Sequence, residues 1–334
     1  MVAENINIAF SFDKNYIAPA KTVIGSLLDS SAVKDVHYNI YLICPDEVKP
    51  YEENITNFIE KKDQTSSVQF CYHNKIFTNG FEVRGISTAA YYRLLLHKFL
   101  PNVDKIIYSD VDIIYRKDLQ NAWMFDMGEN VIAGVKGLAM NISEKWNSLI
   151  KNFPDRKEEF FGLQGKYINS GFLVLDLKKI RNLNIDDNKF IKMSQKHYEY
   201  QDQDIINLVY RNKIAFLPLE YNFITYTSDK DYEQAIAENI ITKHEIDIAQ
   251  NSPVTVHYAG EKPWNSQYVN KANYFINYIK QNPELLKDFN ITKLCIYRNL
   301  FFLKLARLFP MFRKNTQKQY DKVKYYLSIL KERE

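Results

Sequence analysis

Two carboxylates stand two residues apart in the stretch Asp110-Val111-Asp112. They directly follow residues 103–109, a run rich in β-forming side chains that predicts a buried strand. Side chains just beyond the carboxyl end of such a strand point into the crevice where open α/β sheets bind ligands. Carboxylates grouped there are typical ligands of a hard divalent cation, which commonly holds a phosphate. Because Asp-x-Asp is frequent by chance, this metal site depends on further residues.

Among the six histidines, His257 is the best placed to complete the site. It ends the strand-like run 254–256 and is followed by Gly260, Lys262 and Trp264. Glycine lets the backbone approach a ligand closely, and lysine binds phosphate as a point charge. An isolated histidine is more often structural than a ligand, but this context favours a phosphate-binding segment. Two carboxylates and one imidazole suit Mn²⁺, with Mg²⁺ as a substitute, and the lack of thiolate ligands disfavours zinc.

Polar residues also stand out in three further segments, one strand-like and two predicted to be helical. Asn169-Ser170-Gly171 interrupts an apolar strand-like run, where glycine indicates either a bulge or close approach of a ligand. Asp202-Gln203-Asp204 opens a predicted helix, where carboxylates are favoured by the helix dipole. A capping role therefore stays open there beside the binding of sugar hydroxyls. Arg93 lies on another predicted helix and is expected to pair with a carboxylate of the site or with one at the surface.

The first predicted strand ends in the polar cluster Ser11, Asp13, Asn15 and Tyr16. No glycine-rich dinucleotide fingerprint or P-loop follows it, which disfavours a dehydrogenase and a P-loop NTPase. Such a cluster can read a nucleobase and ribose by hydrogen bonds and stacking. The alternative, that Asp13 or Asn15 only caps the next helix, stays open.

The elements that must position these residues alternate in the first half of the chain. Strand-like runs fall at 6–12, 36–44, 67–72 and 103–109. Helical stretches separate them at 16–28, 46–62 and 87–99, the last with Ser87 as its N-cap. This alternation predicts a parallel sheet with right-handed crossovers.

The second half of the chain is less regular. Strand-like runs recur at 131–135, 168–177, 214–217 and 254–258, and helical periodicity covers 186–211. Residues 141–166 predict an excursion of loops and helices, and 226–250 are polar and predicted to be irregular. Without internal repeats or a low-complexity linker, we expect one catalytic domain over residues 1–270 and a tail over 271–334.

Composition supports a full hydrophobic core in a chain of 334 residues, because 46% of them are hydrophobic and 25% charged. Cys44, Cys71 and Cys295 lack metal-ligand spacing and predict reduced thiols. The N-terminal sequence does not resemble a signal peptide, and no apolar run approaches the ~20 residues that span a bilayer. We therefore expect a cytoplasmic protein with no nucleic-acid partner.

The tail differs in charge from the rest of the chain. Residues 291–334 hold 11 Lys and Arg against 3 Asp and Glu, whereas the preceding 290 residues hold 33 against 37. Aromatic side chains accompany these basic ones, and Pro310 divides the tail into two predicted helices. This pattern predicts peripheral attachment to the anionic inner face of the cytoplasmic membrane. A helix packed on the body or a dimer contact remains the alternative, and the oligomeric state stays open.

Taken in order, these motifs closely resemble glycosyltransferase family 8 over about residues 5–265. The family includes glycogenin and bacterial galactosyl- and glucosyltransferases of lipooligosaccharide synthesis. The motifs that carry the resemblance are Phe12-Asp13-x-Asn15-Tyr16, Ile86-Ser87-x-x-x-Tyr91-x-Arg93, Tyr108-Ser109-Asp110-Val111-Asp112, Asn169-Ser170-Gly171, Asp202-Gln203-Asp204-x-x-Asn207 and His257-Tyr258-x-Gly260-x-Lys262-Pro263-Trp264. The resemblance implies a GT-A fold, an α/β architecture with a Rossmann-like mixed central sheet flanked by helices, here followed by a helical tail.

The resemblance also implies a role for each residue singled out above. The metal ligands would be Asp110, Asp112 and His257. The uridine contacts would be Ser11, Asp13, Asn15 and Tyr16, with the backbone of Val111 at the ribose. The donor-sugar contacts would be Arg93, Asn169, Ser170 and Asp202. Gln203 would lie near the anomeric carbon with Asp204 beside it, so that Asp202, Gln203 and Asp204 form the catalytic group. Gly260 and Lys262 would contact the diphosphate, although one residue separates them where the family more usually has two.

The activity implied by the resemblance is the Mn²⁺-dependent transfer of galactose or glucose from a UDP-hexose, with retention at the anomeric carbon. The acceptor would be a saccharide or glycolipid in bacterial surface-polysaccharide or lipooligosaccharide synthesis. Because Gln203 is a poor nucleophile, we expect front-face substitution rather than a covalent intermediate. Two rivals stay open, a self-glucosylating protein like glycogenin and a nucleotide-sugar-binding module without catalysis.

Overall fold

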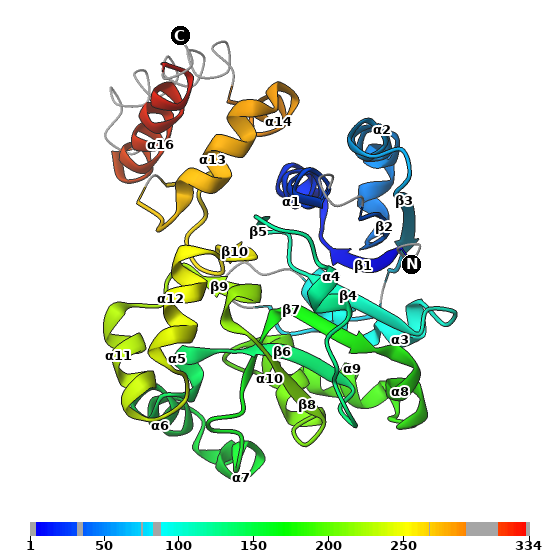
Figure 1. The fold of residues 1–334 in the computed structure, drawn as a ribbon, viewed down its shortest axis with the longest axis vertical. Helices are drawn as coiled ribbons and strands as arrows, with labels where there is room; N and C mark the ends of the chain where they lie inside the picture. The colour runs from blue at the N-terminus through cyan, green and yellow to red at the C-terminus, as the bar shows by residue number, and fades with distance from the viewer. Residues whose placement is uncertain are drawn as a thin grey trace. The chain divides into compact units, whose positions relative to one another are not determined.

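The computed structural model describes residues 5–31, 36–74, 76–82, 88–266, 268–291 and 313–331. The chain divides into two compact units, residues 1–257 and 258–334 (Figure 1). Each unit is described by itself below. The expected functional division at residue 270 stays a prediction.

The first unit is built on a seven-stranded sheet in the order β3-β2-β1-β4-β7-β6-β8. Its first four strands are β1 (Ile6–Ser11), β2 (Tyr38–Cys44), β3 (Ser67–Tyr72) and β4 (Lys105–Ser109). The pairs β1–β2, β2–β3 and β1–β4 are parallel, as the alternating pattern predicted. The connecting helices α1 (Ile17–Ser31) and α2 (Glu52–Lys62) pack against each other. Because β1 and β4 run in parallel register, the residues that follow both strands emerge at the same edge of the sheet.

An antiparallel strand makes the sheet mixed. The second half of the sheet contains β6 (Ile132–Lys136), β7 (Ile168–Asp176) and β8 (Ile214–Leu217). β7 lies antiparallel between β4 and β6, and β6 pairs in parallel with β8. Because Ser109 is paired with Phe172, Asp110 lies opposite Gly171 and its N–H donates to the Gly171 carbonyl at 2.8 Å. The start of β7 is thereby fixed beside the end of β4.

A small three-stranded sheet joins distant parts of the sequence. It consists of β5 (Ile113–Tyr115), β9 (Phe223–Ile224) and β10 (Thr255–His257), with β10 in the middle. His257 is paired with Ile113 in β5 and with Ile224 in β9. Since Asp112 directly precedes Ile113, this pairing brings the histidine beside the Asp110–Asp112 turn.

Several helical predictions needed correction. Residues 88–99 form a 3₁₀ helix (Thr88–Leu95) followed by the single turn α3 (Leu96–Phe99), and the predicted N-cap Ser87 lies outside the described residues. The periodic segment 186–211 is two helices, α9 (Asp187–Ser194) and α10 (Gln201–Val209). Residues 195–200 separate the two helices, and Gln201, the first residue of α10, has the left-handed φ of +41°.

The prediction that residues 226–250 are irregular is wrong. They contain α11 (Asp229–Ala237) and most of α12 (Lys243–Asn251). Each helix begins with a capping box, Ser228 with Asp231 and Thr242 with Glu245. A capping box satisfies backbone N–H groups that otherwise have no partner at a helix start, so it stabilises polar helices of this kind.

The remaining helices of the first unit lie in its connections. They include the excursion predicted between residues 141 and 166. Their bounds are α4 (Gln120–Trp123), α5 (Leu138–Asn141), α6 (Ser143–Asn152), α7 (Lys157–Phe160) and α8 (Leu177–Asn182), with the 3₁₀ helices Lys14–Tyr16, Asp46–Tyr51, Pro154–Arg156 and Leu219–Asn222.

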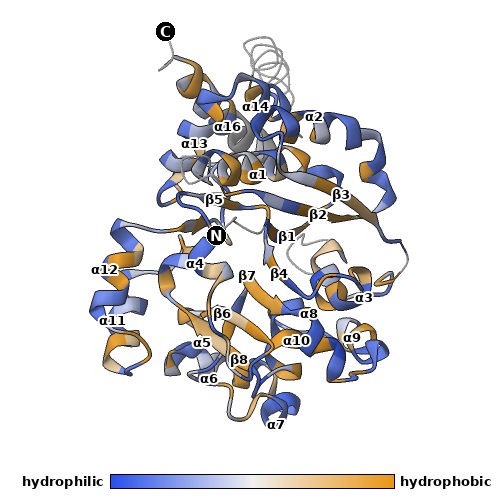
Figure 2. Cartoon of the chain, turned by 45° about the vertical axis from the view of Figure 1, so that its right-hand side comes forward, coloured by the Kyte–Doolittle hydropathy of each residue, from blue (hydrophilic) through white to orange (hydrophobic). Residues whose placement is uncertain are grey.

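Hydrophobic side chains concentrate in the central strands, as the orange β4, β6 and β7 show in Figure 2. Each fully buried aliphatic or aromatic side chain contributes roughly 1.5–3 kcal/mol to folding. Among the described residues, none of the helices combines the length and apolar character needed to cross a bilayer. The first unit therefore has a water-excluding core that can hold polar side chains rigidly at the edge of the sheet.

The second unit contains α13 (Ala272–Gln281), α14 (Pro283–Asp288) and α16 (Arg313–Lys331). Trp264, Phe275 and Phe289 form an aromatic cluster with ring centroids 5.1 to 5.9 Å apart. Tyr325 and Tyr326 of α16 donate hydrogen bonds to the carbonyls of residues 263 and 264. Residues 292–312, which include Cys295 and five aromatic and four basic residues of the tail, lie outside the described residues.

Candidate active site

Asp110, Asp112 and His257 lie together where β4 ends and β10 ends. One ligand atom from each lies within 4.8 Å of the others. His257 Nε2 is 3.2 Å from Asp112 Oδ1 and 3.8 Å from Asp110 Oδ2. The side chains of the three residues are 23%, 13% and 2% exposed, in chain order. Oxygen and nitrogen atoms that share one ion with bonds of about 2.1 Å must lie about 3 to 4 Å apart, so this spacing fits a single cation.

Gly171 leaves room for this cluster. A Cβ atom at position 171 would lie 2.3 Å from His257 Cε1, 2.8 Å from His257 Nδ1 and 2.9 Å from Asp110 Oδ2. These distances are too short for any side chain, so only glycine allows β7 to pass directly beneath the imidazole and the carboxylate. The glycine noted within this strand therefore marks a close approach between protein groups, while β7 keeps its register with β4 here. The donor set and its cradle fit a divalent cation.

Arg93 links the cluster of Asp110, Asp112 and His257, the candidate metal-binding cluster, to a second group of polar residues. Its Nη2 is 2.7 Å from Asp110 Oδ1, and its Nε is 3.2 Å from Asp202 Oδ2. Its guanidinium also stacks over the Tyr108 ring at 4.4 Å and donates to the Ser170 carbonyl at 2.8 Å. Burial alone would lower the pKa of Arg93, but the charges of Asp110 and Asp202 outweigh it and raise that pKa. Of the two pairings expected for Arg93, the structure shows the one inside the site.

The second group lies where β7 begins and α10 begins. Ser170 Oγ donates to Asp202 Oδ2 at 2.9 Å, and Asn169 Nδ2 donates to Gln203 Oε1 at 2.8 Å. Burial and the charge of Asp110 raise the pKa of Asp202, although Arg93 opposes this shift. These polar side chains are at least nine-tenths buried, so they hold one another in a single arrangement.

Asp204 is turned toward the interior. Its Oδ1 accepts a hydrogen bond from the Tyr167 hydroxyl, and its Oδ2 accepts one from the Tyr200 N–H at 2.9 Å. Burial raises the pKa of Asp204 to about 6, although the hydrogen bond from Tyr167 opposes the shift. Burial and the negative charge of Asp204 raise the pKa of Tyr167 well above its usual value, so Tyr167 keeps its proton and acts as the donor.

The residues expected to bind uridine follow β1. Ser11 Oγ donates to the Ala89 carbonyl at 2.6 Å, and Asp13 Oδ1 accepts from the Asn15 N–H at 2.8 Å. The capping role considered for Asp13 is therefore present. Asn15 is exposed and Tyr16 is half-buried, so both offer surface to a ligand at this sheet edge. Val111 is buried within the Asp-x-Asp turn.

Gly260 and Lys262 belong to the second unit and are described separately from the cluster. Lys262 Nζ donates to the Tyr258 carbonyl at 2.7 Å. Their expected contact with a diphosphate stays a prediction.

The sequence matches the family described as Glycosyl transferase family 8 over residues 7–268. The chain belongs to glycosyltransferase family 8. The match includes every candidate site residue, from Ser11 to Lys262.

Curated relatives of this family 8 chain include lipopolysaccharide glycosyltransferases. It is 26% identical to the lipopolysaccharide 1,2-glucosyltransferase of Escherichia coli K12, over 79% of this chain and 74% of that protein. It is 23% identical to the lipopolysaccharide 1,3-galactosyltransferase of Salmonella typhimurium, over 79% and 74%. Among solved structures, the galactosyltransferase LgtC in complex with donor and acceptor sugar analogs matches with a TM-score of 0.68 and 22% identity, over 85% of this chain and 100% of that one. This likeness confirms the expected GT-A fold.

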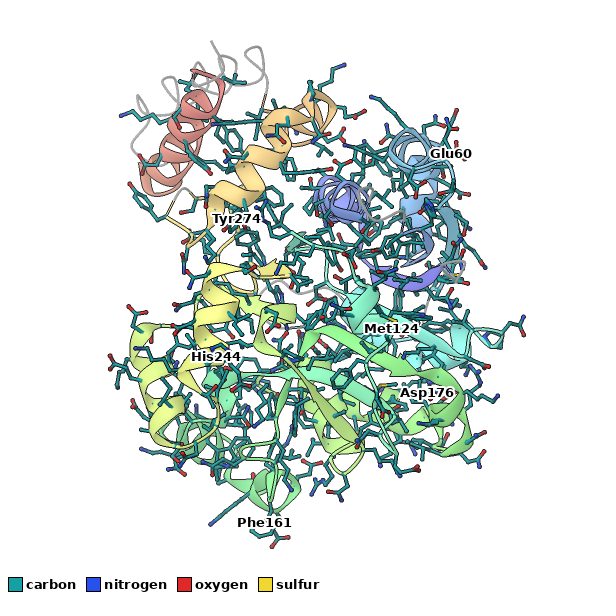
Figure 3. The ribbon with its side chains drawn as sticks, in the orientation of Figure 1. Glu60, Met124, Phe161, Asp176, His244 and Tyr274 are labelled. Atoms are coloured by element: carbon teal, nitrogen blue, oxygen red, sulfur yellow. The ribbon has the colours of Figure 1, made fainter. Side chains whose placement is uncertain are left out.

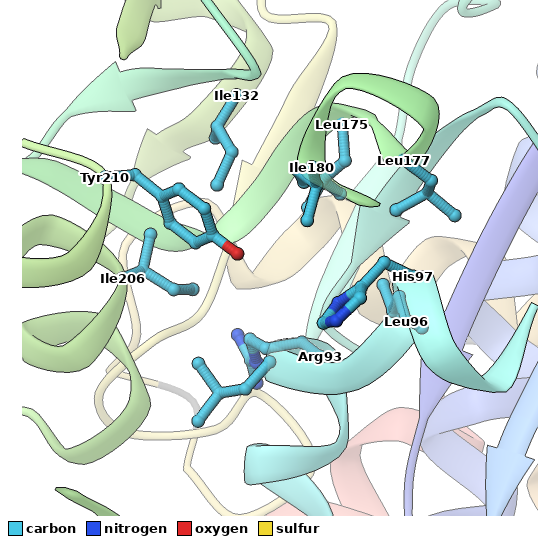
Figure 4. Close-up of a pocket in the computed structure, with 10 residues that line it drawn as sticks. Arg93, Leu96, His97, Ile132, Leu175, Leu177, Ile180, Ile206 and Tyr210 are labelled. Atoms are coloured by element: carbon cyan, nitrogen blue, oxygen red, sulfur yellow. The ribbon is translucent and has the colours of Figure 1, made fainter. Parts of the chain in front are cut away.

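A small cavity lies behind the site of this glycosyltransferase rather than within it. Arg93 and His97 line it together with Tyr210, and the rest of its wall is aliphatic: Leu94, Leu96, Ile132, Leu175, Leu177, Ile180 and Ile206 (Figure 4). Such a wall offers few hydrogen bonds to a sugar or a diphosphate, so we assign the cavity to the core.

Histidines other than His257 have structural or surface positions. His97 Nε2 pairs with Asp187 at 3.0 Å, and His37 Nδ1 pairs with Asp63 at 2.9 Å. His244 is exposed on α12 (Figure 3). Among the described residues, only Asp110, Asp112 and His257 meet as a group with metal-ligand spacing.

Three further polar residues contribute to the site, and no role was predicted for any of them. Asn222 Oδ1 lies 2.8 Å from His257 Nδ1, Tyr167 joins Gln203 to Asp204, and Asn207 binds both backbone groups of Ile168. Asn207 stood in the family motif without an assigned role. Asn222 and Tyr167 carry no local pattern, although Tyr167 precedes the Asn169-Ser170-Gly171 motif by only two residues.

Proposed function

We propose that this family 8 protein is a retaining hexosyltransferase that uses a UDP-hexose, with galactose or glucose as the sugar, in the presence of Mn²⁺ or Mg²⁺. The acceptor is a saccharide or glycolipid of bacterial surface-polysaccharide or lipooligosaccharide synthesis. The names of the curated lipopolysaccharide glucosyl- and galactosyltransferases support this choice of sugar and acceptor class.

One observation carries the proposal. Arg93 spans from the metal-binding cluster to Asp202, so the cation ligands and the sugar-facing residues form one continuous site. A nucleotide sugar has the same two parts, an anionic diphosphate and a neutral hexose with many hydroxyls. The acidic cluster suits a cation that binds the first part, and the amide and hydroxyl groups of Asn169, Ser170 and Gln203 suit the second.

Charge development explains how the residues would act. As the glycosidic bond breaks, UDP gains negative charge. Asp110, Asp112 and His257 would hold a divalent cation, which would supply electrostatic stabilisation of that charge. Ser11, Asp13, Asn15 and Tyr16 would hold the uridine, with the Val111 backbone at the ribose. Arg93, Asn169, Ser170 and Asp202 would orient the hexose, and Gly260 with Lys262 would contact the diphosphate. Orientation of this kind lowers the barrier, because the entropy of aligning the reacting groups is lost on binding and not in the transition state.

Retention without a covalent intermediate agrees with the surroundings of Asp204. Both of its oxygens accept hydrogen bonds from protein donors, and the residue is fully buried. This favours a positioning role for Asp204 over nucleophilic attack. Gln203 is a weak nucleophile, so the acceptor hydroxyl would attack from the face that UDP leaves, hydrogen-bonded to the departing phosphate. Trapping of a glycosyl group on Asp204 in the wild-type enzyme would contradict this mechanism.

A donor panel tests the function directly. The purified protein is incubated with UDP-galactose, UDP-glucose or UDP-N-acetylglucosamine, each with Mn²⁺, Mg²⁺ or EDTA, and the released UDP is measured. We expect release from one of the two simple hexose donors, with the divalent cations and not with EDTA. Release that is independent of metal would contradict the assignment of the cluster. In this assay the hexose passes to water or to the protein itself. Mass spectrometry of the protein after the reaction separates hydrolysis from self-glucosylation, which would add hexoses to the chain.

Peripheral attachment to an anionic membrane through the basic tail is the second part of the proposal. It rests on the charge difference between residues 291–334 and the preceding chain. We expect the full-length protein to sediment with vesicles that contain anionic lipids and not with neutral vesicles. Equal sedimentation with both would contradict an electrostatic attachment.

A further inference from the structure

A continuous chain of side-chain hydrogen bonds crosses the site from the metal-binding cluster to Asp204. Its contacts in order are His257 Nδ1 to Asn222 Oδ1 at 2.8 Å, Asn222 Nδ2 to Asn169 Oδ1 at 2.8 Å, Asn169 Nδ2 to Gln203 Oε1 at 2.8 Å, Gln203 Nε2 to the Tyr167 hydroxyl at 3.2 Å, and that hydroxyl to Asp204 Oδ1. All six residues are at least nine-tenths buried. We refer to this set as the amide chain.

Backbone N–H groups determine the direction of the amide chain. The Gly171 N–H donates to Asn169 Oδ1 at 2.8 Å, and the Ser170 N–H donates to Gln203 Oε1 at 3.2 Å. A backbone N–H can only donate, so each of these side-chain atoms must be the carbonyl oxygen. At the far end, the Tyr200 N–H donates to Asp204 in the same way. If the side-chain amide of Asn169 or Gln203 were rotated by 180°, its NH₂ group would face the backbone N–H, and two donors would meet.

The fixed orientation of Asn169 determines the protonation of His257. Because Asn169 Oδ1 is an acceptor, the atom of Asn222 that faces it must be the donor Nδ2. Asn222 Oδ1 then faces His257, and His257 Nδ1 must carry a proton to donate to it. The other ring nitrogen, Nε2, faces Asp110 and Asp112. A histidine binds a cation through the nitrogen that carries no proton, so a proton held on Nδ1 directs the cation to Nε2.

We propose that Asn222 is a positioning residue that sets the tautomer of His257 and, through Asn169, the orientation of the Gln203 amide. This inference rests on the proposed function, since it assigns roles within the same site. A reversed amide at any point would leave buried donors facing each other, which is costly in a site that excludes water. One directional chain thus prepares the metal ligand and the sugar-facing glutamine together.

A purely structural role for Asn222 is the alternative, because it ends the 3₁₀ helix Leu219–Asn222 beside β9. Asn141 provides a matched control for that role. It is equally buried, donates to the carbonyls of Gly137 and Tyr167, and accepts from the Tyr167 N–H, and no contact joins it to the amide chain side chains. Replacing Asn141 removes comparable buried hydrogen bonds without touching His257.

The decisive measurement is the tautomer of His257 in the metal-free protein, read from ¹⁵N–¹H NMR of labelled histidine and assigned with His257→Gln. We expect a proton on Nδ1 in the wild type and in Asn222→Asp, whose carboxylate still accepts it. In Asn222→Leu, which lacks the acceptor, we expect the Nδ1 proton to lose its hydrogen bond and to exchange faster with solvent. A wild type without a proton on Nδ1, or an unchanged Nδ1 signal in folded Asn222→Leu, would overturn the proposal even if the donor sugar were wrongly assigned.

Binding and turnover measurements separate the two ends of the amide chain. We expect Asn222→Leu to weaken Mn²⁺ binding in the presence of UDP by about 10- to 100-fold, as is usual for partners of metal ligands. Asn222→Asp keeps the acceptor for His257 but loses the donor to Asn169, so we expect Mn²⁺ binding within a few-fold of the wild type and a lower kcat. Asn141→Leu should lower the melting temperature without changing Mn²⁺ binding. Equal losses of Mn²⁺ affinity in Asn141→Leu and Asn222→Leu would show a merely structural role.

Discussion

The two ends of the candidate site differ in how their charges and hydrogen bonds are balanced. At the end proposed to bind metal, called here the metal-binding end, Asp110 and Asp112 face His257 across 3.2 to 3.8 Å at the edge of the sheet. At the end proposed to face the sugar, called the sugar-facing end, Asn169, Gln203 and Asp204 are buried, and their oxygen atoms accept hydrogen bonds from protein donors. Arg93 lies between them and carries a positive charge that both ends share.

This difference indicates how each end contributes to function. Two carboxylates brought close together repel each other, and a bound cation relieves that repulsion. The metal-binding end is therefore completed by its ligand. The sugar-facing end is already complete, so its dipoles need little reorganisation when a hexose binds, which favours stabilisation of the transition state. Variants should accordingly affect the metal-binding end through affinity and the sugar-facing end through turnover or stability.

The largest effect is expected from Asp112→Asn at the metal-binding end. Loss of one anionic ligand should lower metal-dependent turnover of the UDP-hexose by about 100-fold or more, because the cation supplies several kcal/mol of stabilisation. Released UDP is measured with Mn²⁺, and thermal unfolding is measured without metal. The melting temperature should not fall, since the substitution removes repulsion between carboxylates.

Asp176→Asn is the matched control for this prediction. Asp176 is a carboxylate of similar exposure that caps α8 far from the site, and asparagine caps helices equally well (Figure 3). Its turnover should equal that of the wild type. Wild-type turnover by Asp112→Asn would remove the contrast between the two ends.

Gly171→Ala should have the next largest effect, because Gly171 lies beneath the metal-binding end. The new Cβ would come within 2.3 Å of His257 Cε1, so the imidazole must move. Displacement of a site group by about 1 Å can reduce activity by about 100-fold, and overpacking costs about 1–3 kcal/mol of stability. We expect Mn²⁺ affinity, measured by electron paramagnetic resonance with UDP present, to fall by about 10- to 100-fold.

Gly137→Ala offers the corresponding control. A Cβ atom at position 137 would lie 3.6 Å from its nearest neighbour, the backbone nitrogen of Asn169. The φ of −76° at Gly137 suits any residue. Mn²⁺ affinity should remain unchanged in this variant. If Gly171→Ala also kept wild-type affinity, the close approach of β7 would not define the metal-binding end.

The smallest effect concerns stability at the sugar-facing end and its dependence on pH. Burial raises the pKa of Asp204 from 3.8 in the unfolded chain to about 6 in the folded one. The folded state therefore binds the proton more tightly. The stability that this proton contributes is fully present below about pH 4 and is lost as the pH rises through about 6. The two-unit shift corresponds to about 3 kcal/mol.

Asp204→Asn removes this titration, so the wild type should lose stability relative to the variant between pH 4 and 6. Urea unfolding at a series of pH values, followed by tryptophan fluorescence, measures the difference. If the free energy of unfolding depended on pH in the same way for both proteins, Asp204 would not bear a buried charge. That result would weaken the distinction between the two ends.

Strands and the residues at their ends were predictable from local sequence. Asp110 and Asp112 follow β4, and His257 ends β10, where the β-rich runs placed them. Alternating or continuous apolar residues reveal a strand because each side chain must face the core or the solvent. The helices between 226 and 250 were missed because their polar composition concealed the capping boxes at Ser228 and Thr242.

The amide chain could not have been predicted in this way. Asn222, Asn169, Gln203 and Tyr167 come from four segments, and their pairing follows from the antiparallel position of β7 and the break at Gln201. Nothing in the spacing of asparagine or tyrosine along the chain shows which polar group it will meet. The direction of the chain depends on backbone N–H groups whose orientation exists only in the folded sheet.

By itself, the sequence determined the types of ligand, the strand ends that carry them and membership of the family, because these depend on residue identity and local periodicity. The tertiary structure decided which distant groups meet. The pairing of β10 with β5 brings His257 to Asp112, and the absence of a side chain at Gly171 permits the approach of β7. Burial then turns ordinary polar residues into a hydrogen-bonded chain with one direction, since an unpaired donor in the core is costly.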